Sequence, residues 1–290
     1  SDEPIHIGVI GGSGLYNMPQ LTDVEHRHMD TPFGAPSAAI TIGRLGGVPA
    51  AFIPRHGVGH VFLPQEVPYR ANIYALKMLG VRWVVGINAC GSLREDYAPG
   101  HIVVPDQIFD NKRSRAEHTF FGEGLVAHIG VADPFCASLS HLVAESVREA
   151  GGTVHEGGTS VVIEGPRFST KAESYFFRQA GFSILSMTSS PEAFLAREAE
   201  MCYATMAHVT DYDVWHESEA PVTVEMVINT LHGNVEIARK AVMGLVTKLS
   251  RVSEPCEHED ALASAIMTAR ERVSPEALQR LEAIVGKYYR

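Results

Sequence analysis

Residues 5–14, IHIGVIGGSG, join a short apolar run to a glycine-rich turn, and short apolar runs recur along the chain. Further runs lie at residues 82–87, 101–104, 182–186 and 203–210. Runs of this length predict buried strands, and segments of helical periodicity separate them. Such alternation is typical of an α/β fold around a largely buried central sheet. Gly46-Gly47, between two more runs, predicts an antiparallel hairpin, so the sheet should be mixed.

Helices are predicted by their end signals as well as by their periodicity. The predicted helices cover residues 66–79, 134–150, 190–200 and 224–249. Ser190-Pro191-Glu192 supplies an N-cap, a first-turn proline and a first-turn acid, while Thr170 and Glu173 have capping-box spacing. The polar, acidic segment SEPCEHED at 253–260 follows the longest helix. We therefore expect one α/β domain over residues 1–252 and a helical tail over 253–290.

Composition excludes several classes of protein. The chain has 290 residues, 45% of them hydrophobic and 20% charged, which predicts a packed core and not disorder. With 24 Lys and Arg against 34 Asp and Glu, a broad nucleic-acid surface is disfavoured, although a small anion can still bind to a local cluster of positive groups. There is no signal-like segment and no apolar run of about 18 residues. We expect a cytoplasmic protein that binds neither nucleic acid nor membrane.

Cysteines and histidines give no sequence signal for a metal or a disulfide. The four cysteines are Cys90, Cys136, Cys202 and Cys256. They are far apart and form no CxxC pair, so we expect buried free thiols, no disulfide and no structural zinc. His56 and His60 have the spacing of a metal pair, but Gly57 and Gly59 oppose a helix there and no glutamate follows His56. No metal site is predicted.

Four predicted strand ends carry groups suited to an anion. They are residues 11–14 (GGSG), 54–57 (PRHG), 88–92 (NACGS) and 187–192 (MTSSPE). The first is weak evidence, because it lacks both the dinucleotide fingerprint and a Walker lysine, and a plain tight turn fits equally well. The second offers a planar guanidinium and an imidazole. Because ligands bind outside the carboxyl ends of strands in open α/β sheets, the four ends are expected to converge. The expected phosphate site comprises Ser13, Arg55, His56, Ala89 and Thr188.

Two carboxylates close the last predicted strand, in Thr210-Asp211-Tyr212-Asp213. On a continuing strand Asp211 and Asp213 point to the same face, so one can donate a proton while the other accepts from an amino group. A solvated turn is the commoner fate of aspartate after a strand. Val209 and Trp215 nearby favour instead a partly buried acid with a raised pKa.

Seven motifs in order, GVIGGSGLY, PRHG, ANIYALK, NACGSL, IEGPRFST, MTSSPE and TDYDVW, carry a family resemblance. From about residue 7 to about residue 249 the chain resembles the trimeric purine nucleoside phosphorylase family. The resemblance implies the nucleoside phosphorylase fold, a mixed and partly barrel-like sheet flanked by helices. It also implies phosphorolysis, in which inorganic phosphate, a co-substrate, attacks C1′ of a nucleoside and releases the purine. No cofactor or metal is implied, and the tail has no counterpart in the resemblance.

The resemblance also assigns residues. It places the phosphate site on the five residues predicted above. It places the nucleoside site on Phe168 and Ser169 beside the purine, Met187 at the sugar, and Thr210, Asp211 and Asp213 at the N7 and 6-amino edge. Val224, Val227 and Ile228 would line an apolar 5′ pocket that suits a methylthio group. His128 stands where the family uses a histidine from a neighbouring subunit, which implies a homotrimer with shared sites.

The aspartate pair predicts the preferred base. A carboxylate accepts a hydrogen bond from a 6-amino group, whereas a 6-oxo group needs a donor, so the pair favours adenine. Together with the apolar 5′ pocket that the resemblance implies, this leads us to expect 5′-methylthioadenosine as substrate and adenosine as a weaker one. Asp211 is the favoured donor to N7 with Asp213 in support, and the opposite division is also open. Asn88 matches the 6-oxopurine branch, and Ser13 replaces a threonine. The alternatives are a 6-oxopurine nucleoside phosphorylase and a nucleoside-binding protein without turnover.

Overall fold

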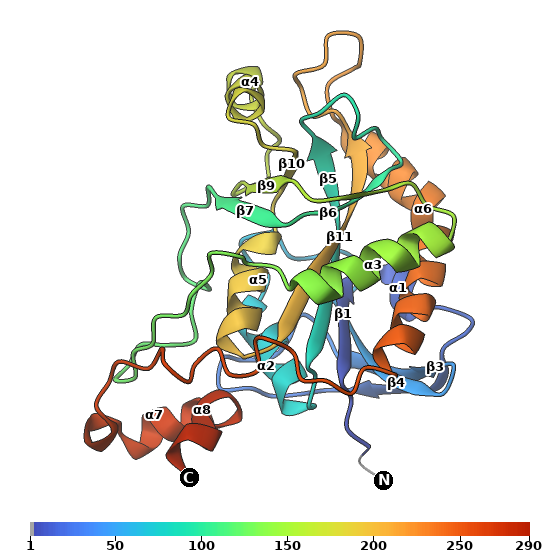
Figure 1. The fold of residues 1–290 in the computed structure, drawn as a ribbon. Helices are drawn as coiled ribbons and strands as arrows, with labels where there is room; N and C mark the ends of the chain where they lie inside the picture. The colour runs from blue at the N-terminus through green and yellow to red at the C-terminus, as the bar shows by residue number, and fades with distance from the viewer. Residues whose placement is uncertain (1–2) are drawn as a thin grey trace.

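The computed structural model describes residues 3–290, without the side chains of Ser13 and Tyr16. The strands are β1 (Ile7–Gly11), β2 (Thr22–Arg27), β3 (Ile40–Leu45), β4 (Val48–Pro54), β5 (Trp83–Ser92), β6 (Ile102–Val104), β7 (Gln107–Asp110), β8 (Val154–Glu156), β9 (Thr159–Val162), β10 (Ile184–Ser186) and β11 (Cys202–Asp211). The helices are α1 (Ser13–Tyr16), α2 (Tyr69–Met78), α3 (Ala137–Glu149), α4 (Lys171–Gln179), α5 (Ser189–Glu198), α6 (Val224–Leu249), the 3₁₀ turn η1 (Arg270–Arg272), α7 (Pro275–Arg280) and α8 (Glu282–Tyr289). Together the strands form one 11-stranded sheet (Figure 1).

The sheet is mixed and branches at β5. Its main path runs β2-β3-β4-β1-β5-β10-β9-β7, while β11 also pairs with β5 and carries β6 and β8. Strands β4, β1, β5 and β11 are mutually parallel, whereas β3 with β4 and β10 with β5 are antiparallel. The predicted hairpin is confirmed, with Gly46 and Gly47 at φ 56° and 84° in its turn. The α/β class and mixed sheet predicted from the sequence are therefore confirmed.

Helices cover both faces of the sheet (Figure 1). On one face α3 and α6 pack over a core that includes Val85, Val143 and Val246. On the other face α2 and α5 pack over Ile73 and Leu195. The longest helix, α6, has the bounds predicted from its apolar periodicity. No helix in the described part of the chain is long and apolar enough to cross a bilayer.

The segment Asn88–Ser92 was expected to be a turn, and this is wrong, because β5 continues through it. Gly91 pairs with Asp211 of β11 on one side and with Leu185 of β10 on the other. The small side chains of this segment let β5 continue between β10 and β11. The run of small residues therefore indicates a strand at this place. Strands β2 and β7 were not predicted, because neither has an apolar run.

The tail packs on the body of the protein. Leu262, Leu281 and Ile284 are buried in the same core as α2 and α5. A disulfide joins Cys202, the first residue of β11, to Cys256 in the tail. The expectation of no disulfide is therefore wrong, because folding brings together two cysteines 54 residues apart that no local motif links. Cys90 and Cys136 are free and buried, as predicted.

Candidate active site

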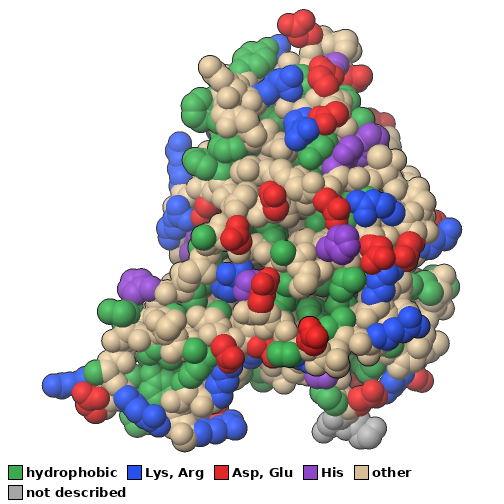
Figure 2. All heavy atoms as spheres, in the orientation of Figure 1, with side chains coloured by type: hydrophobic (Ala, Val, Ile, Leu, Met, Phe, Trp, Pro, Cys, Tyr) green, Lys and Arg blue, Asp and Glu red, His purple; other side chains and the backbone are tan. Residues whose placement is uncertain are grey.

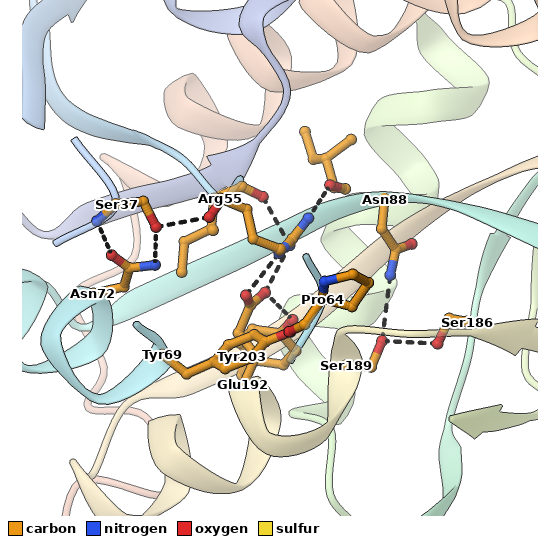
Figure 3. A network of polar contacts seen from close by, with 12 residues as sticks. Ser37, Arg55, Pro64, Tyr69, Asn72, Asn88, Ser186, Ser189, Glu192 and Tyr203 are labelled. Atoms are coloured by element: carbon orange, nitrogen blue, oxygen red, sulfur yellow. Dashed lines mark hydrogen bonds and ion pairs between the residues drawn. The ribbon is translucent and has the colours of Figure 1, made fainter. Parts of the chain in front are cut away.

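A buried ion pair lies beside the ends of β1 and β4 and the middle of β5 (Figure 3). Arg55 follows β4, and its Nε and Nη2 donate to the two carboxylate oxygens of Glu192 at 2.8 and 2.7 Å. Its remaining contacts are the carbonyl oxygens of Ile10 and Ile87, and Tyr203 Oη donates to Glu192 at 2.7 Å. Both charged side chains are at most 3% exposed. Burial alone lowers the pKa of Arg55, but the adjacent carboxylate outweighs this and raises it.

This geometry changes the part that Arg55 can play. We expected its guanidinium to form a fork toward phosphate, yet four of its five N–H groups are used inside the protein. The guanidinium instead joins the end of β4, the end of β1 and the middle of β5 to the first turn of α5. Glu192 was recognised in the sequence only as a first-turn acid. An arginine and a glutamate 137 residues apart give no local signal of pairing.

His56 is a neutral imidazole in this structure. Its Nδ1 lies 2.9 Å from the carbonyl oxygen of Phe62, which only accepts, so Nδ1 carries the proton and Nε2 a lone pair. Burial and the charge of Arg55 lower the pKa of His56 to about 4. Its ring stacks on His60 at 4.2 Å, so this pair is an aromatic contact in the structure. Nε2 is therefore suited to accept a proton from a protonated phosphate oxygen or a sugar hydroxyl.

The first turn of α5 provides polar groups beside β5. Thr188 is the N-cap, is buried, and makes no side-chain capping bond. Asn88 of β5 donates from Nδ2 to Ser189 Oγ at 3.3 Å, as Figure 3 shows. Asn88 Oδ1 and Ser190 Oγ are buried without a hydrogen-bond partner among the described residues. Ala89 is half-buried next to Asn88. The Asn88–Ser189 bond joins β5 to α5, and the contacts of Arg55 bring the ends of β1 and β4 to the middle of β5. The side chain of Ser13 lies outside the described residues.

Lys112 belongs to this region and was missed by the sequence reasoning. It is 4% exposed, and its Nζ donates to the carbonyl oxygens of Met187 and Ser190 at 3.0 and 3.1 Å. The ammonium group also lies 5.3 Å from the centre of the Tyr69 ring. Burial lowers the pKa of Lys112. The lysine holds both ends of the segment that contains Thr188, and nothing in its sequence neighbourhood marks it.

The two predicted acids lie at the end of β11. Asp211 Oδ2 accepts from Thr210 Oγ1 at 2.6 Å, and its Oδ1 accepts from the backbone N–H of Asp213 at 2.7 Å. The ladder with β5 shifts register just before Asp211, and Asp213 has φ 54°. A Cβ at Gly91 would lie 3.0 Å from Asp211 Oδ1. The glycine of NACGS therefore provides the space in which the aspartate pair folds back, a role not recognised in the sequence.

Both acids have raised pKa values. Burial raises the pKa of Asp211 to about 6, with a further contribution from the negative charge of Asp213. Burial also raises the pKa of Asp213, against the stabilising effect of the nearby hydroxyls of Ser174 and Ser169. Asp213 Oδ2 and both of these hydroxyl oxygens are buried and lack a partner in hydrogen-bond geometry within the described chain. The hydroxyls face the Asp213 carboxylate without closing a hydrogen bond of good geometry, so the cluster keeps hydrogen-bonding capacity for a ligand.

The other residues predicted for the nucleoside site lie in the segment before α4, after β10 and at the start of α6, and several of them are partly or largely exposed. Phe168 is half-buried in the segment before α4, and Met187 is half-buried after β10. The start of α6 is attached to β11 by Thr230 Oγ1, which donates to the Thr210 carbonyl at 3.4 Å. Val224 and Ile228 there are 63% and 55% exposed, and Val227 is half-buried.

His128 is not part of the cluster in its own chain. It is exposed, and its backbone N–H donates to Ala265 of the tail. Figure 1 places the tail and the end of β11 far apart. One chain therefore leaves the predicted 5′ face open.

Comparisons with known proteins agree with this architecture. Residues 6–251 match the Phosphorylase superfamily. S-methyl-5′-thioadenosine phosphorylases of Gloeobacter violaceus and Chloroflexus aurantiacus are each 52% identical, over 97% and 98% of this chain and 95% and 98% of theirs. These alignments extend into the tail, for which the sequence showed no resemblance.

Solved structures give the same result. A methylthioadenosine phosphorylase from an Antarctic soil metagenomic library has a TM-score of 0.93 at 44% identity, covering 97% of this chain and 99% of that one. The Schistosoma mansoni methylthioadenosine phosphorylase in complex with adenine has a TM-score of 0.82 at 37% identity, covering 86% and 93%. The chain therefore belongs to the phosphorylase superfamily, and within it to the group of the S-methyl-5′-thioadenosine phosphorylases.

Proposed function

We propose that this protein cleaves 5′-methylthioadenosine with inorganic phosphate, giving adenine and 5-methylthioribose 1-phosphate. The observation that carries the proposal is the buried Asp211–Asp213 pair, whose free oxygen Asp213 Oδ2 has no protein partner. The names of the relatives support the same substrate. The Schistosoma relative named adenosine/methylthioadenosine phosphorylase supports adenosine as a weaker substrate.

In the proposed reaction the glycosidic bond breaks with positive charge developing on the sugar. Phosphate bound near His56, Ala89 and Thr188 attacks C1′, and its negative charge stabilises the developing cation. Ser13 would add a donor at the start of α1. Arg55 supports this site by holding the strand ends to α5 and by its positive charge. Because phosphate is both nucleophile and counter-charge, the proposed step uses no metal or organic cofactor.

The purine leaves more readily when N7 is protonated. An acid with a pKa of about 6 holds a proton in a useful fraction of molecules near neutral pH, so Asp211 remains the favoured donor. Asp213 Oδ2 would accept from the 6-amino group, with Ser169 and Phe168 beside the base. The opposite division of roles stays open, because Asp213 has the freer oxygen. In either case, the O6 atom of a 6-oxopurine would face a carboxylate oxygen, and both atoms are hydrogen-bond acceptors.

We propose a homotrimer in which a neighbour completes each site. Apolar side chains are exposed around α4 beside polar and charged ones, as Figure 2 shows, and Tyr175 and Phe176 are 52% and 62% exposed. Val58 and Val61, in the loop after His56, are each 66% exposed. Exposed apolar surface beside a site is typical of a subunit interface. His128 of a neighbour would then close the 5′ side over Val227, and we place the assembly in the cytoplasm.

Substrate profiling tests the proposal. Purified protein is incubated with phosphate and, separately, with 5′-methylthioadenosine, adenosine, 5′-methylthioinosine and inosine, and purine release is measured. We expect 5′-methylthioadenosine to be cleaved fastest and only when phosphate is present. Faster cleavage of inosine would establish the 6-oxopurine alternative, which Asn88 favours. Binding without phosphate-dependent cleavage would establish a nucleoside-binding protein instead.

A further inference from the structure

Three buried cysteines and a histidine gather at the start of β11, at the other end of the strand from Asp211. Cys202 begins β11, Cys136 is the N-cap of α3, and Cys256 lies in the tail. Their sulfur atoms all lie within 4.8 Å of one another. Cys136 Sγ also lies within 4.8 Å of a ring nitrogen of His258. A ten-residue strand spans roughly 30 Å, so this cluster is separate from the proposed active site.

A buried arginine lies against the cluster without a carboxylate partner. Arg197 is 7% exposed and donates to the carbonyl oxygens of Gly130 and Asp133 and to His258 Nε2, at 2.9, 2.7 and 3.2 Å. It forms no salt bridge with any residue that the structure describes. A buried cation is stable only near negative charge, so the surroundings of Arg197 call for an anionic group. The carboxylates of Glu257 and Asp133 act on Arg197 from nearby without forming a salt bridge with it, and the sulfur atoms, as thiolates, can supply further negative charge.

Cys136 links the two parts of the cluster. As the N-cap of α3, a helix of 13 residues, it lies at the positive end of the helix dipole. Arg197 adds a second positive charge nearby. Cys136 is also the member shared by both groups of close ligand atoms, the three sulfurs and the set with Glu257 and His258. It therefore occupies the centre of the cluster.

We propose that, once the Cys202–Cys256 disulfide is reduced, Cys136, Cys202, Cys256 and His258 bind one thiophilic divalent cation such as zinc. Three thiolates and one imidazole are a common ligand set for tetrahedral zinc. With a divalent cation and a neutral imidazole, the site carries one net negative charge. The guanidinium of Arg197 lies close enough to offset this charge.

The two states of the cluster are related by a balanced reaction. The disulfide takes up two electrons and two protons from a dithiol, which itself becomes a disulfide. Binding of the cation then releases the protons of the three thiols. The tail is attached to β11 by a covalent bond in the oxidised state and by the cation in the reduced state. Metal binding here is structural and independent of the proposed phosphorolysis.

Cobalt(II) tests the proposal on the unaltered full-length protein. One sample is reduced with an excess of dithiol, the dithiol is removed under anaerobic conditions, and the protein is titrated with cobalt(II). A second sample is oxidised before the same titration. We expect one cobalt per chain in the reduced sample, with intense thiolate-to-cobalt charge transfer and the visible bands of tetrahedral coordination, and displacement by zinc. The oxidised sample should show neither. A reduced protein without the tetrahedral spectrum overturns the proposal.

Variants then identify the ligands. Cys136→Ser and Cys256→Ser should each weaken cobalt binding at least about 100-fold, while Cys90→Ser, a buried free thiol elsewhere, should bind as the unaltered protein does. His258→Ala should keep the charge-transfer bands and shift the visible ones, because a water would take the fourth position. Unchanged binding by Cys136→Ser overturns the assignment, even if the protein binds cobalt. Phosphorolysis, measured in parallel, should not change with added zinc.

Discussion

The two ends of the proposed active site differ in how completely the protein satisfies their polar groups. At the phosphate end, Arg55 and Glu192 are buried together and hold each other with two hydrogen bonds. At the base end, Asp213 Oδ2 and the nearby hydroxyls of Ser169 and Ser174 are buried and close no hydrogen bond of good geometry with any residue that the structure describes. The ion pair is complete before any ligand binds, although Asn88 Oδ1 and Ser190 Oγ beside it are not, whereas the charged group at the base end keeps an oxygen for a ligand. Charged groups that hold a site together and charged groups that recognise a substrate can thus be distinguished by their hydrogen bonds.

The difference has a physical reason. A phosphate that serves as nucleophile must be held in one place, so rigid strand ends, fixed by a buried ion pair, suit it. A base is selected by the penalty of leaving buried polar groups unmatched, so those groups must be free in the empty protein. The predictions below test this division, beginning with the largest effect.

Removing one partner of the buried ion pair should affect stability most. Glu192→Gln leaves the Arg55 charge buried and uncompensated, so we expect a loss of about 3–5 kcal/mol in the free energy of unfolding. Denaturant unfolding measures it. Glu117→Gln is the matched control, because its pair with Arg70 is about 30% exposed, and it should cost less than about 1 kcal/mol. Equal losses in the two variants would show that the ion pair does not hold the phosphate end together.

Changing the base end should affect catalysis and leave the fold intact. Asp211→Asn removes the proton donor, and we expect kcat/KM for 5′-methylthioadenosine to fall about 100-fold, or about 3 kcal/mol. Preference should also shift toward the 6-oxopurine nucleosides, because the amide can donate. Asp213→Asn, assayed beside it, distinguishes the two acids. Only the variant that lacks the N7 donor should cleave nucleosides with poorly leaving purines much more slowly than nucleosides with good leaving purines. An unchanged substrate ratio in both variants would exclude the pair from base recognition.

The raised pKa of Asp211 predicts a pH dependence of stability. The folded state holds this proton up to about pH 6, whereas the unfolded state loses it near 3.8, so the free energy of unfolding falls as pH rises between them. Above pH 7 the full cost is about 1–3 kcal/mol. Asp211→Asn should therefore be more stable than the unaltered protein at pH 8 and nearly equal to it at pH 4. Thermal unfolding at both values measures this, and a constant difference would contradict the burial effect.

The smallest expected effect comes from Lys112. Lys112→Met keeps the apolar stem but removes the donor to the Met187 and Ser190 carbonyls, which loosens the segment carrying Thr188. We expect KM for phosphate to rise about tenfold, equivalent to about 1.4 kcal/mol, with little change in kcat. Exposed Lys171→Met serves as the control. A change in kcat alone would show that Lys112 acts on the chemical step and not on phosphate binding.

Much of the fold was predictable because its signals are local. The apolar runs, the glycines at 46 and 47, the capping box at Thr170 and the long periodicity of α6 each depend on neighbours in the chain. The strand through Asn88–Ser92 was not predicted, because its small residues form a strand only between β10 and β11. The disulfide was missed for a similar reason, since 54 residues separate its two cysteines.

The sequence by itself determined the α/β class, the expectation that segments at 11–14, 54–57, 88–92 and 187–192 lie together, and the aspartate pair that would select the base. Tertiary structure alone decided which of these groups are free to act. It joined Arg55 to Glu192, left Asp213 Oδ2 without a partner, attached Lys112 to the Thr188 segment and gathered three cysteines around Arg197. The reason is physical: motifs record residue type and spacing, whereas burial, pKa and hydrogen-bond satisfaction depend on groups that meet only after the chain has folded.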